Sequence, residues 1–210
     1  MEECTYKIIL VGNANVGKTT FFNKINNDYY KLQKHSATIG VDFTIFHKVN
    51  NNINIKINLW DTAGQEKYRS LIKTYFRDAC GYLLMFDLNN YDSFKALKEW
   101  YEDIQTMNHC KHEHPVLLIG NKKDLESKVD KKEIENFLAY KTNIIYSELS
   151  LKEENNIQIV FKLLLDHISH TLYLSDEKCN GIKIKDECFK RKSFILEPPK
   201  ISIEKKKCCN

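Results

Sequence analysis

The sequence KIILVGNANVGKT, residues 7–19, is the most informative segment for the fold. It opens with a short apolar run rich in β-branched side chains, which is typical of a buried strand. The run ends at Gly12, where a tight turn is expected, and a helix is expected to begin at about Gly17. The order of strand, glycine-containing turn and helix is the context in which the pattern G-x-x-x-x-G-K-[ST] has a structural meaning.

Residues 12–19 match that pattern and indicate a loop that binds phosphate groups. The glycines let the backbone curl so that successive N–H groups point at an anion, and the helix N-terminus adds a partial positive charge. Lys18 is expected to bridge the outer phosphates, and Thr19 to offer its hydroxyl to Mg²⁺. The alternative is a solvated glycine turn, because the four fixed positions occur by chance in roughly one random chain in a hundred. The candidate nucleotide-binding residues of this loop are Asn13, Ala14, Asn15, Val16, Gly17, Lys18 and Thr19.

Farther along the chain, short apolar runs alternate with segments of helical periodicity. Strands are expected at residues 41–49, 53–60, 82–87, 115–120 and 143–147, and helices at 93–107, 131–141 and 157–172. The asparagines at 50–52 form a polar turn, so the first two of these strands make a hairpin. The alternation predicts an α/β three-layer fold around a six-stranded, mostly parallel sheet with one antiparallel hairpin edge strand. Ligands of such sheets gather at the carboxyl ends of the strands.

A second motif, DTAGQE at residues 61–66, follows the strand that ends at Trp60. A carboxylate at a strand end can reach a bound metal ion, so Asp61 is a candidate metal ligand. Gly64 permits its N–H group to approach a γ-phosphate, and Gln65 is a candidate catalytic residue that orients the attacking water, together with Lys18. A lone D-x-x-G would be an ordinary turn, but in this order after the phosphate loop it indicates nucleoside triphosphate hydrolysis.

A third motif, NKKD at residues 121–124, emerges from the strand expected at 115–120. A carboxylate accepts two hydrogen bonds, which suits the N1–H and exocyclic amine of guanine and not the acceptor N1 of adenine. Asp124 therefore predicts a guanine nucleotide and argues against an ATP-dependent kinase. The alternative is a solvated run of charges, and Asn121 and Lys122 join Asp124 as candidate base-binding residues.

Charge is distributed unevenly along this chain of 210 residues with a net charge of +4. Residues 178–210 hold all of the basic excess, and the part before them is slightly acidic, so no footprint for nucleic acid is expected. The periodicity fails after about residue 176. We expect a domain at 1–175 and a flexible basic tail at 176–210. The start of the chain has no secretion signal, and no apolar run is long enough for a spanning helix.

With these three motifs assembled, the chain resembles the Ras-like small GTPases, and over residues 6–174 it is similar to the Rab family in particular. The sequences that carry the resemblance are IGVDF at 39–43, WDTAGQE at 60–66, KYRSL at 67–71 and YFRDA at 75–79. The resemblance implies that Thr38 joins Thr19 and Asp61 as a Mg²⁺ ligand. It also implies that Tyr30 covers the guanine face and that Thr20 touches the α-phosphate.

The same resemblance implies a surface, a reaction and a set of partners. Phe43, Trp60 and Tyr75 match the aromatic triad through which Rabs meet effectors, although ordinary core packing is the alternative for Trp60. The implied activity is that of a monomeric GTP/GDP switch with Mg²⁺, which hydrolyses GTP slowly and recruits effectors in vesicle-mediated protein transport. The implied partners are a GTPase-activating protein, a guanine-nucleotide exchange factor, a Rab escort protein, a GDP-dissociation inhibitor and effectors.

Two departures from the family pattern affect the site. The guanine loop that reads ETSAK in the family is ELSLK at residues 148–152, so Leu151 supplies a backbone donor where relatives have alanine, between Ser150 and Lys152. In the phosphate loop, Asn15 stands where many relatives have glycine, and crowding near the γ-phosphate would slow hydrolysis. One rival function is therefore a binding module held in a single nucleotide state. A nuclear-transport GTPase is less well supported, because that relative ends in an acidic tail.

The end of the chain reads CCN, with Cys208 and Cys209 before Asn210. It resembles Rab termini on which both cysteines receive geranylgeranyl groups, and the alternatives are inert thiols or adventitious metal binding. Stable membrane attachment needs two signals, which two prenyl chains beside Lys205, Lys206 and Lys207 would supply. The implied location is the cytoplasmic face of an endomembrane compartment, with cycling through the cytosol.

Overall fold

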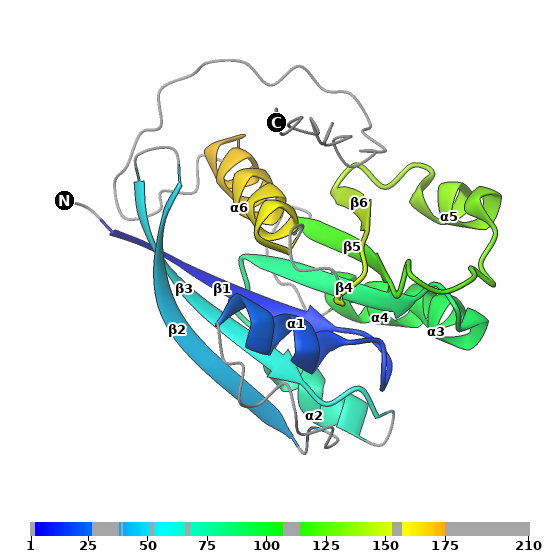
Figure 1. Cartoon of the computed structure of the whole chain (residues 1–210). Coiled ribbons are helices and arrows are strands. Elements are labelled where there is room, and N and C mark those ends of the chain that lie inside the picture. Colours follow the sequence, from blue (N-terminus) through cyan, green and yellow to red (C-terminus); the bar gives the residue numbers. More distant parts are fainter. Residues whose placement is uncertain are drawn as a thin grey trace, which may run out of the picture.

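The computed structural model describes residues 3–26, 38, 40–50, 53–65, 68–106, 114–152 and 157–174. Figure 1 shows the elements in space. The strands are β1 Glu3–Val11, β2 Val41–Asn50, β3 Ile53–Thr62, β4 Gly81–Asp87, β5 Val116–Asn121 and β6 Ile144–Glu148. The helices are α1 Lys18–Ile25, α2 Arg69–Thr74, α3 Tyr91–Lys95, α4 Leu97–Thr106, α5 Lys131–Leu138 and α6 Ile157–Leu174.

The strands form one six-stranded sheet in the order β2-β3-β1-β4-β5-β6. β2 and β3 pair antiparallel, and the other neighbours are parallel, so the predicted fold class with its hairpin edge strand is confirmed. The register pairs Leu10 with Asp61, and Asp87 with Asn121. The carboxyl ends of β1, β3 and β5, where the three sequence motifs begin, therefore lie along one edge of the sheet together with that of β4.

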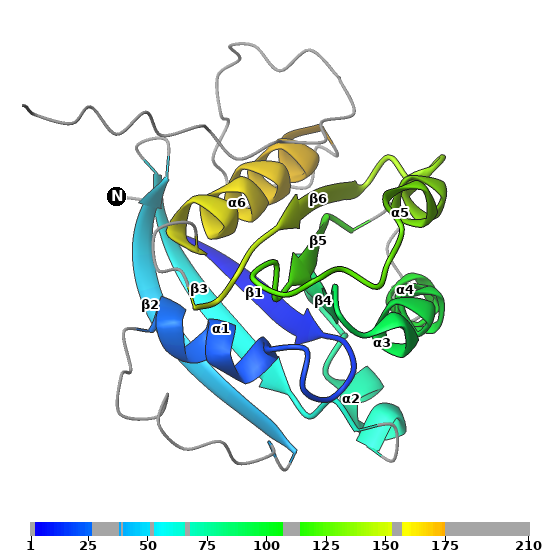
Figure 2. The ribbon, with the colours of Figure 1, turned by 45° about the vertical axis from the view of Figure 1, so that its right-hand side comes forward.

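Helices cover both faces of the sheet (Figure 2). On one face, Ile8 and Leu10 of β1 pack in a cluster with apolar side chains of α1 and α6. On the other face, Ile9 and Val11 pack with side chains of α2, α3, α4 and α5. Alternate residues of β1 thus enter opposite cores, as the two-residue period of a strand requires. The central strands β4 and β5 are buried along their whole length, which explains their unbroken apolar runs.

Several element boundaries differ from the sequence prediction. The helix expected at 93–107 is two consecutive segments, α3 and α4, and it starts earlier because the Asn90 side chain accepts hydrogen bonds from the N–H groups of Asp92 and Ser93. α5 ends at Leu138 because Tyr140 adopts a left-handed conformation, with φ of 65°. The short helix α2 carries no periodicity long enough to predict it. None of the helices within the described residues is long and apolar enough to span a membrane.

Candidate functional site

The phosphate loop turns from the end of β1 into α1 through two glycines with positive φ. Gly12 has φ of 140°, and a Cβ atom there would lie 2.2 Å from the backbone oxygen of Met85. Gly17 has φ of 107° and is the N-cap residue of α1. L-residues rarely adopt these angles, so glycine is required at both ends of the turn. The loop thereby presents the N-terminus of α1 at the carboxyl edge of the sheet, a suitable site for an anion.

Lys18 is buried inside this loop. Its ammonium group donates hydrogen bonds to the backbone oxygens of Gly12 and Asn13, each at 2.8 Å. Burial lowers the pKa of Lys18 to about 8, and the nearby Asp61 carboxylate acts in the opposite direction. A desolvated cation in this position is poised to interact strongly with an anionic ligand.

Oxygen atoms of Thr19, Thr38 and Asp61 converge beside Lys18. The Thr19 hydroxyl lies 2.7 Å from both the Thr38 hydroxyl and Asp61 Oδ2, and the Thr38 hydroxyl donates to the same carboxylate oxygen at 3.4 Å. Asp61 is fully buried, and its Oδ1 atom has no hydrogen-bond partner among the described residues. Burial raises the pKa of Asp61 to about 6. One carboxylate with hydroxyl oxygens is a donor set that suits Mg²⁺, whose remaining ligands come from water and substrate phosphates.

Gly64 lies directly against the phosphate loop. A Cβ atom at this position would be 2.4 Å from both the carbonyl carbon and oxygen of Asn13 and from Lys18 Nζ. Only a glycine backbone can approach so closely. Gln65, the candidate for orienting water, follows it in a half-buried position, and its backbone oxygen accepts a hydrogen bond from the N–H of Tyr68 at 3.0 Å.

Asn121 connects the phosphate end of the site to the predicted guanine end. Its side-chain amide donates to the backbone oxygen of Val16 at 2.7 Å and accepts from the backbone N–H of Leu151 at 3.3 Å. The guanine loop is further held to β5 by the hydrogen bond from the N–H of Leu149 to the oxygen of Gly120 at 2.9 Å. The two loops are therefore one connected unit.

Asp124 is held by the residues that follow β6. Its two carboxylate oxygens accept hydrogen bonds from the Ser150 hydroxyl at 2.7 Å and from Lys152 Nζ at 2.6 Å. The hydrogen bonds from Lys152 and Ser150 hold the pKa of Asp124 below its usual value, so the group is an anion at neutral pH. Lys122 has φ of 63° and forms an ion pair with Asp87 at 2.7 Å. Hydrogen bonds thus connect Asp124 to Ser150 and Lys152, and Asn121 to Leu151.

The departures from the family pattern have structural explanations. Asn15 has φ of 63° in the exposed turn of the phosphate loop, and asparagine tolerates this left-handed conformation better than most residues other than glycine. Leu149 and Leu151 are both buried in the core cluster beneath α1 and α6. The Leu151 side chain reaches the phosphate loop, because its Cδ1 atom would lie 2.9 Å from a Cβ atom at Gly17.

The three aromatic residues of the predicted effector surface lie in one row. The rings of Phe43 and Trp60, a cross-strand pair of β2 and β3, stack with centroids 5.2 Å apart. Trp60 also contacts Tyr75, at 5.6 Å between centroids. Phe43 is 55% exposed, and Trp60 and Tyr75 are half-buried. The Trp60 ring thus lies between the exposed Phe43 and Tyr75, the C-cap residue of α2, and it also packs against the core cluster on the α2 side of the sheet.

Of the remaining predicted residues, Ala14 is exposed and Thr20 is half-buried at the start of α1. Tyr30, Cys208 and Cys209 lie outside the described residues. The sequence reasoning missed Trp100, whose indole N–H donates to the side-chain oxygen of Asn13 at 2.7 Å. No local pattern signals a contact between residues so far apart in the chain.

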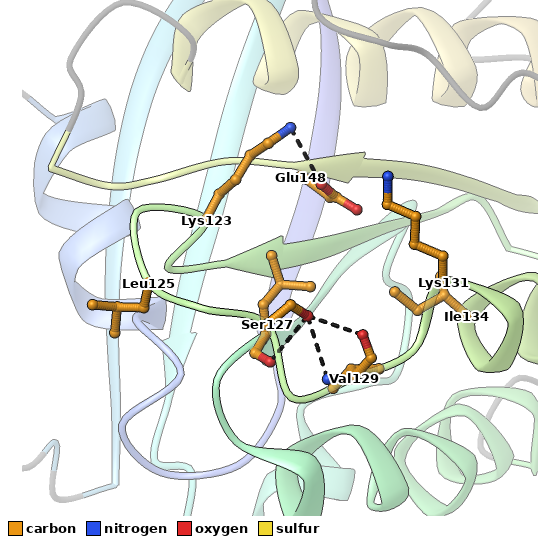
Figure 3. Close-up of a pocket in the computed structure, with 8 residues that line it drawn as sticks. Lys123, Leu125, Ser127, Val129, Lys131, Ile134 and Glu148 are labelled. Carbon is orange, nitrogen blue, oxygen red and sulfur yellow. Dashed lines mark hydrogen bonds and ion pairs between the residues drawn. The ribbon is translucent and has the colours of Figure 1, made fainter.

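A small pocket lies beside the guanine motif (Figure 3). It has a volume of about 100 Å³ and is lined by Leu88, Lys123, Leu125, Ser127, Val129, Lys131, Ile134 and Glu148. An ion pair between Lys123 and Glu148, at 3.2 Å, crosses one side, and the Ser127 hydroxyl bonds to the backbone of Val129. None of the residues predicted to bind nucleotide or metal lines this pocket, so it is distinct from the candidate site.

Comparisons with known proteins agree with this arrangement. A model of the Ras family matches residues 7–170. The human Ras-related protein Rab-3A is 36% identical over 183 residues, which cover 85% of this chain and 82% of that protein. The rat GTP-binding protein Rab-3D is 38% identical over 164 residues, covering 78% of this chain and 74% of that protein. The bovine Ras-related protein Rab-3C is 35% identical over 164 residues, with coverage of 78% and 71%.

Proposed function

Since the chain belongs to the Rab family of Ras-like small GTPases, which bind guanine nucleotides and hydrolyse GTP, we propose that its carboxyl-edge site binds GTP and GDP and acts as a molecular switch in vesicle-mediated transport. The observation that carries the proposal is the bridge made by Asn121. This one side chain hydrogen-bonds to the phosphate loop at Val16 and to the guanine loop at Leu151. A nucleotide would thus meet two loops that the fold already joins.

The phosphates bind in the curl of residues 13–20. Backbone N–H groups and the N-terminus of α1 face the α- and β-phosphates, and the family resemblance adds the Thr20 contact. The Lys18 ammonium donates to two backbone oxygens of the loop. From this position it also binds the β- and γ-phosphates. The oxygen atoms of Thr19, Thr38 and Asp61 would hold Mg²⁺, which when bound neutralises phosphate charge.

The base binds between the NKKD motif and residues 150–152. Asp124 accepts from the N1–H and the exocyclic amine of guanine, and the backbone N–H of Leu151 donates toward the guanine carbonyl. Ser150 and Lys152 orient the Asp124 carboxylate through the hydrogen bonds described above. Lys122 and, by family resemblance, Tyr30 cover the faces of the base.

Hydrolysis proceeds by in-line attack of water on the γ-phosphate. The bond between the γ-phosphorus and the oxygen that bridges it to the β-phosphate breaks, and GDP and inorganic phosphate result. Gln65 orients the water, while Lys18 and backbone N–H groups stabilise the negative charge that develops. We expect a slow intrinsic rate, because none of the residues proposed to contact the γ-phosphate is an arginine. A GTPase-activating protein that supplies one would accelerate the reaction by about 10³ to 10⁵.

Loss of the γ-phosphate releases Thr38 and Gly64, the two residues that contact it in the triphosphate state. Both belong to segments next to the aromatic row of Phe43, Trp60 and Tyr75. Effectors that recognise this row in the GTP state therefore dissociate after hydrolysis. An exchange factor, acting on the same segments, restores the GTP form.

The C-terminal tail is the part of the chain that would attach the protein to a membrane. Geranylgeranyl groups on Cys208 and Cys209, added after an escort protein presents the folded domain, would anchor the chain to the cytoplasmic face of an endomembrane compartment, and a GDP-dissociation inhibitor would extract it to the cytosol. We expect the Cys208→Ser/Cys209→Ser variant to bind and hydrolyse GTP normally and to be wholly cytosolic on cell fractionation, with each single variant partly mislocalised. Membrane recovery equal to that of the parent would show that the tail anchors by other means.

The rival function is a GTP-binding module whose altered guanine loop, with Leu149 and Leu151, holds one nucleotide state permanently. Analysis of the nucleotide bound to purified full-length protein separates the two. The switch function predicts that preloaded GTP is converted to bound GDP, which then exchanges with free GTP. Bound GTP that is neither hydrolysed nor exchanged over hours would favour the permanent module.

A further inference from the structure

Asn13 is the point at which three parts of the molecule meet. Its backbone oxygen accepts the Lys18 ammonium at 2.8 Å. Its carbonyl group lies so close to Gly64 that a Cβ atom there would be 2.4 Å away. Its side-chain oxygen accepts the indole N–H of Trp100 at 2.7 Å. The first two contacts are with groups assigned above to the outer phosphates, and the third comes from a helix with no assigned role.

Trp100 is held firmly in α4. The residue is 3% exposed and packs in the core cluster on the α4 side of the sheet. The Arg69 guanidinium of α2 lies over the ring, 5.1 Å from its centroid. Arg69 is in turn fixed to α4 by its hydrogen bond to Asp103 at 2.5 Å and by an ion pair with Glu99. The buried indole therefore contacts the phosphate loop with its N–H group and α2 with its face.

We propose that Trp100 is a positioning residue for GTP hydrolysis, which holds Asn13 in place beneath Lys18 and Gly64 and couples the phosphate loop to α2 through Arg69. The proposal rests on the proposed function of the site. A rotation of Asn13 would displace the carbonyl that Lys18 and Gly64 both contact, and so would misplace both groups relative to the γ-phosphate. The hydrogen bond from Trp100 opposes that rotation, because the ring itself cannot move within its packed surroundings.

The test compares single-turnover hydrolysis of bound GTP by four full-length proteins: the parent, Trp100→Phe, Asn13→Ala and the double variant. Each single variant is expected to slow hydrolysis roughly three- to tenfold, the range for loss of one hydrogen bond. The double variant is expected to be no slower than the slower single variant, because both changes remove the same contact. For Trp100→Phe, GDP affinity should stay within about threefold of the parent, since Trp100 lies in α4, outside the loop to which the phosphates are assigned.

Tyr101→Phe is the matched control. It removes an aromatic hydrogen-bond donor from the same helix, because the Tyr101 hydroxyl donates to the Asn143 side chain at 2.8 Å, far from the phosphate loop in the fold. Its hydrolysis rate should equal that of the parent. If Trp100→Phe folds poorly, the hydrolysis rate of Asn13→Ala provides the test, because this variant keeps the buried Trp100 ring. Parent-like hydrolysis by Asn13→Ala and Trp100→Phe, or slowing in the double variant equal to the product of the single effects, would overturn the proposal. Failure of the parent itself to hydrolyse GTP would instead overturn the proposed function, and this inference with it.

Fluorescence supplies a readout that a purely structural role would not change. The chain has two tryptophans, so Trp100 is the only one left in a Trp60→Phe background. Replacing GDP by a non-hydrolysable GTP analogue should change its emission, and adding Asn13→Ala should abolish that change. Emission that is independent of the nucleotide, or a nucleotide response that survives Asn13→Ala, would contradict the coupling.

Discussion

Replacing Gly17 with alanine puts a methyl group where the phosphate loop meets the guanine motif. The new Cβ atom would lie 2.3 Å from the side-chain nitrogen of Asn121 and 2.9 Å from Cδ1 of Leu151. The Asn121 nitrogen is the donor to the backbone oxygen of Val16. The substitution therefore adds backbone strain and displaces the side chain that joins the two halves of the site.

Gly40→Ala separates these two costs. Gly40 also has a positive φ, 83°, but a Cβ atom there meets nothing within 4 Å. Its substitution should cost backbone strain alone, about 1 to 2 kcal/mol of unfolding free energy. Gly17→Ala should cost the same strain plus the loss of a buried hydrogen bond, about 1 to 3 kcal/mol more. The difference between the two variants measures the cost of the overlap with Asn121 and Leu151.

Urea unfolding of the GDP-bound proteins measures the free energies, and release of a fluorescent GDP analogue measures the site. We expect Gly17→Ala to be less stable than Gly40→Ala by at least about 1 kcal/mol and to release GDP at least about tenfold faster. Equal stabilities for the two variants, together with parent-like GDP release from Gly17→Ala, would refute the packing described for Asn121.

Three further substitutions test other parts of the account. Gln65→Leu should leave GTP affinity nearly unchanged and remove most intrinsic hydrolysis in a single-turnover assay, and equal rates would refute its assignment. Asp124→Asn should shift preference from guanine toward xanthine nucleotides in competition binding with GTP, ATP and XTP, and a retained GTP preference would contradict the guanine assignment. Burial lowers the pKa of His167 in the folded protein. As the pH falls below about 6.5, the unfolded chain therefore binds more protons than the folded protein, and the parent loses stability. His167→Gln should reduce this loss of stability at low pH. Urea unfolding at pH 7 and pH 5 checks this, and equal pH dependence in parent and variant would exclude His167 as the cause.

The fold was largely predictable because its strands are buried on both faces and appear as apolar runs. β4 and β5 are examples, and their predicted bounds differ from the observed ones by one residue. Strand order was not predictable from these runs, since periodicity says nothing about which strands pair. The start of α3 was missed because it depends on the Asn90 cap, a side-chain interaction rather than a periodic pattern.

The site was predictable to the extent that its chemistry lies in short motifs at strand ends. The phosphate loop and Asp124 follow strands, Asp61 lies in the last two residues of β3, and parallel strands bring their carboxyl ends to one edge. The contacts that join the motifs were not predictable. Trp100 and Asn13 are 87 positions apart and Asn121 and Val16 are 105 apart, so only the folded structure brings these side chains together.

The most direct test of the account is to load purified full-length protein with GTP and Mg²⁺ and to follow the bound nucleotide over time, with ATP as the competing ligand. We expect GTP to be bound in preference to ATP and to be converted slowly to GDP by the parent, and we expect Gln65→Leu to retain GTP. Equal binding of ATP, or GTP that persists on the parent as long as on Gln65→Leu, would contradict the account.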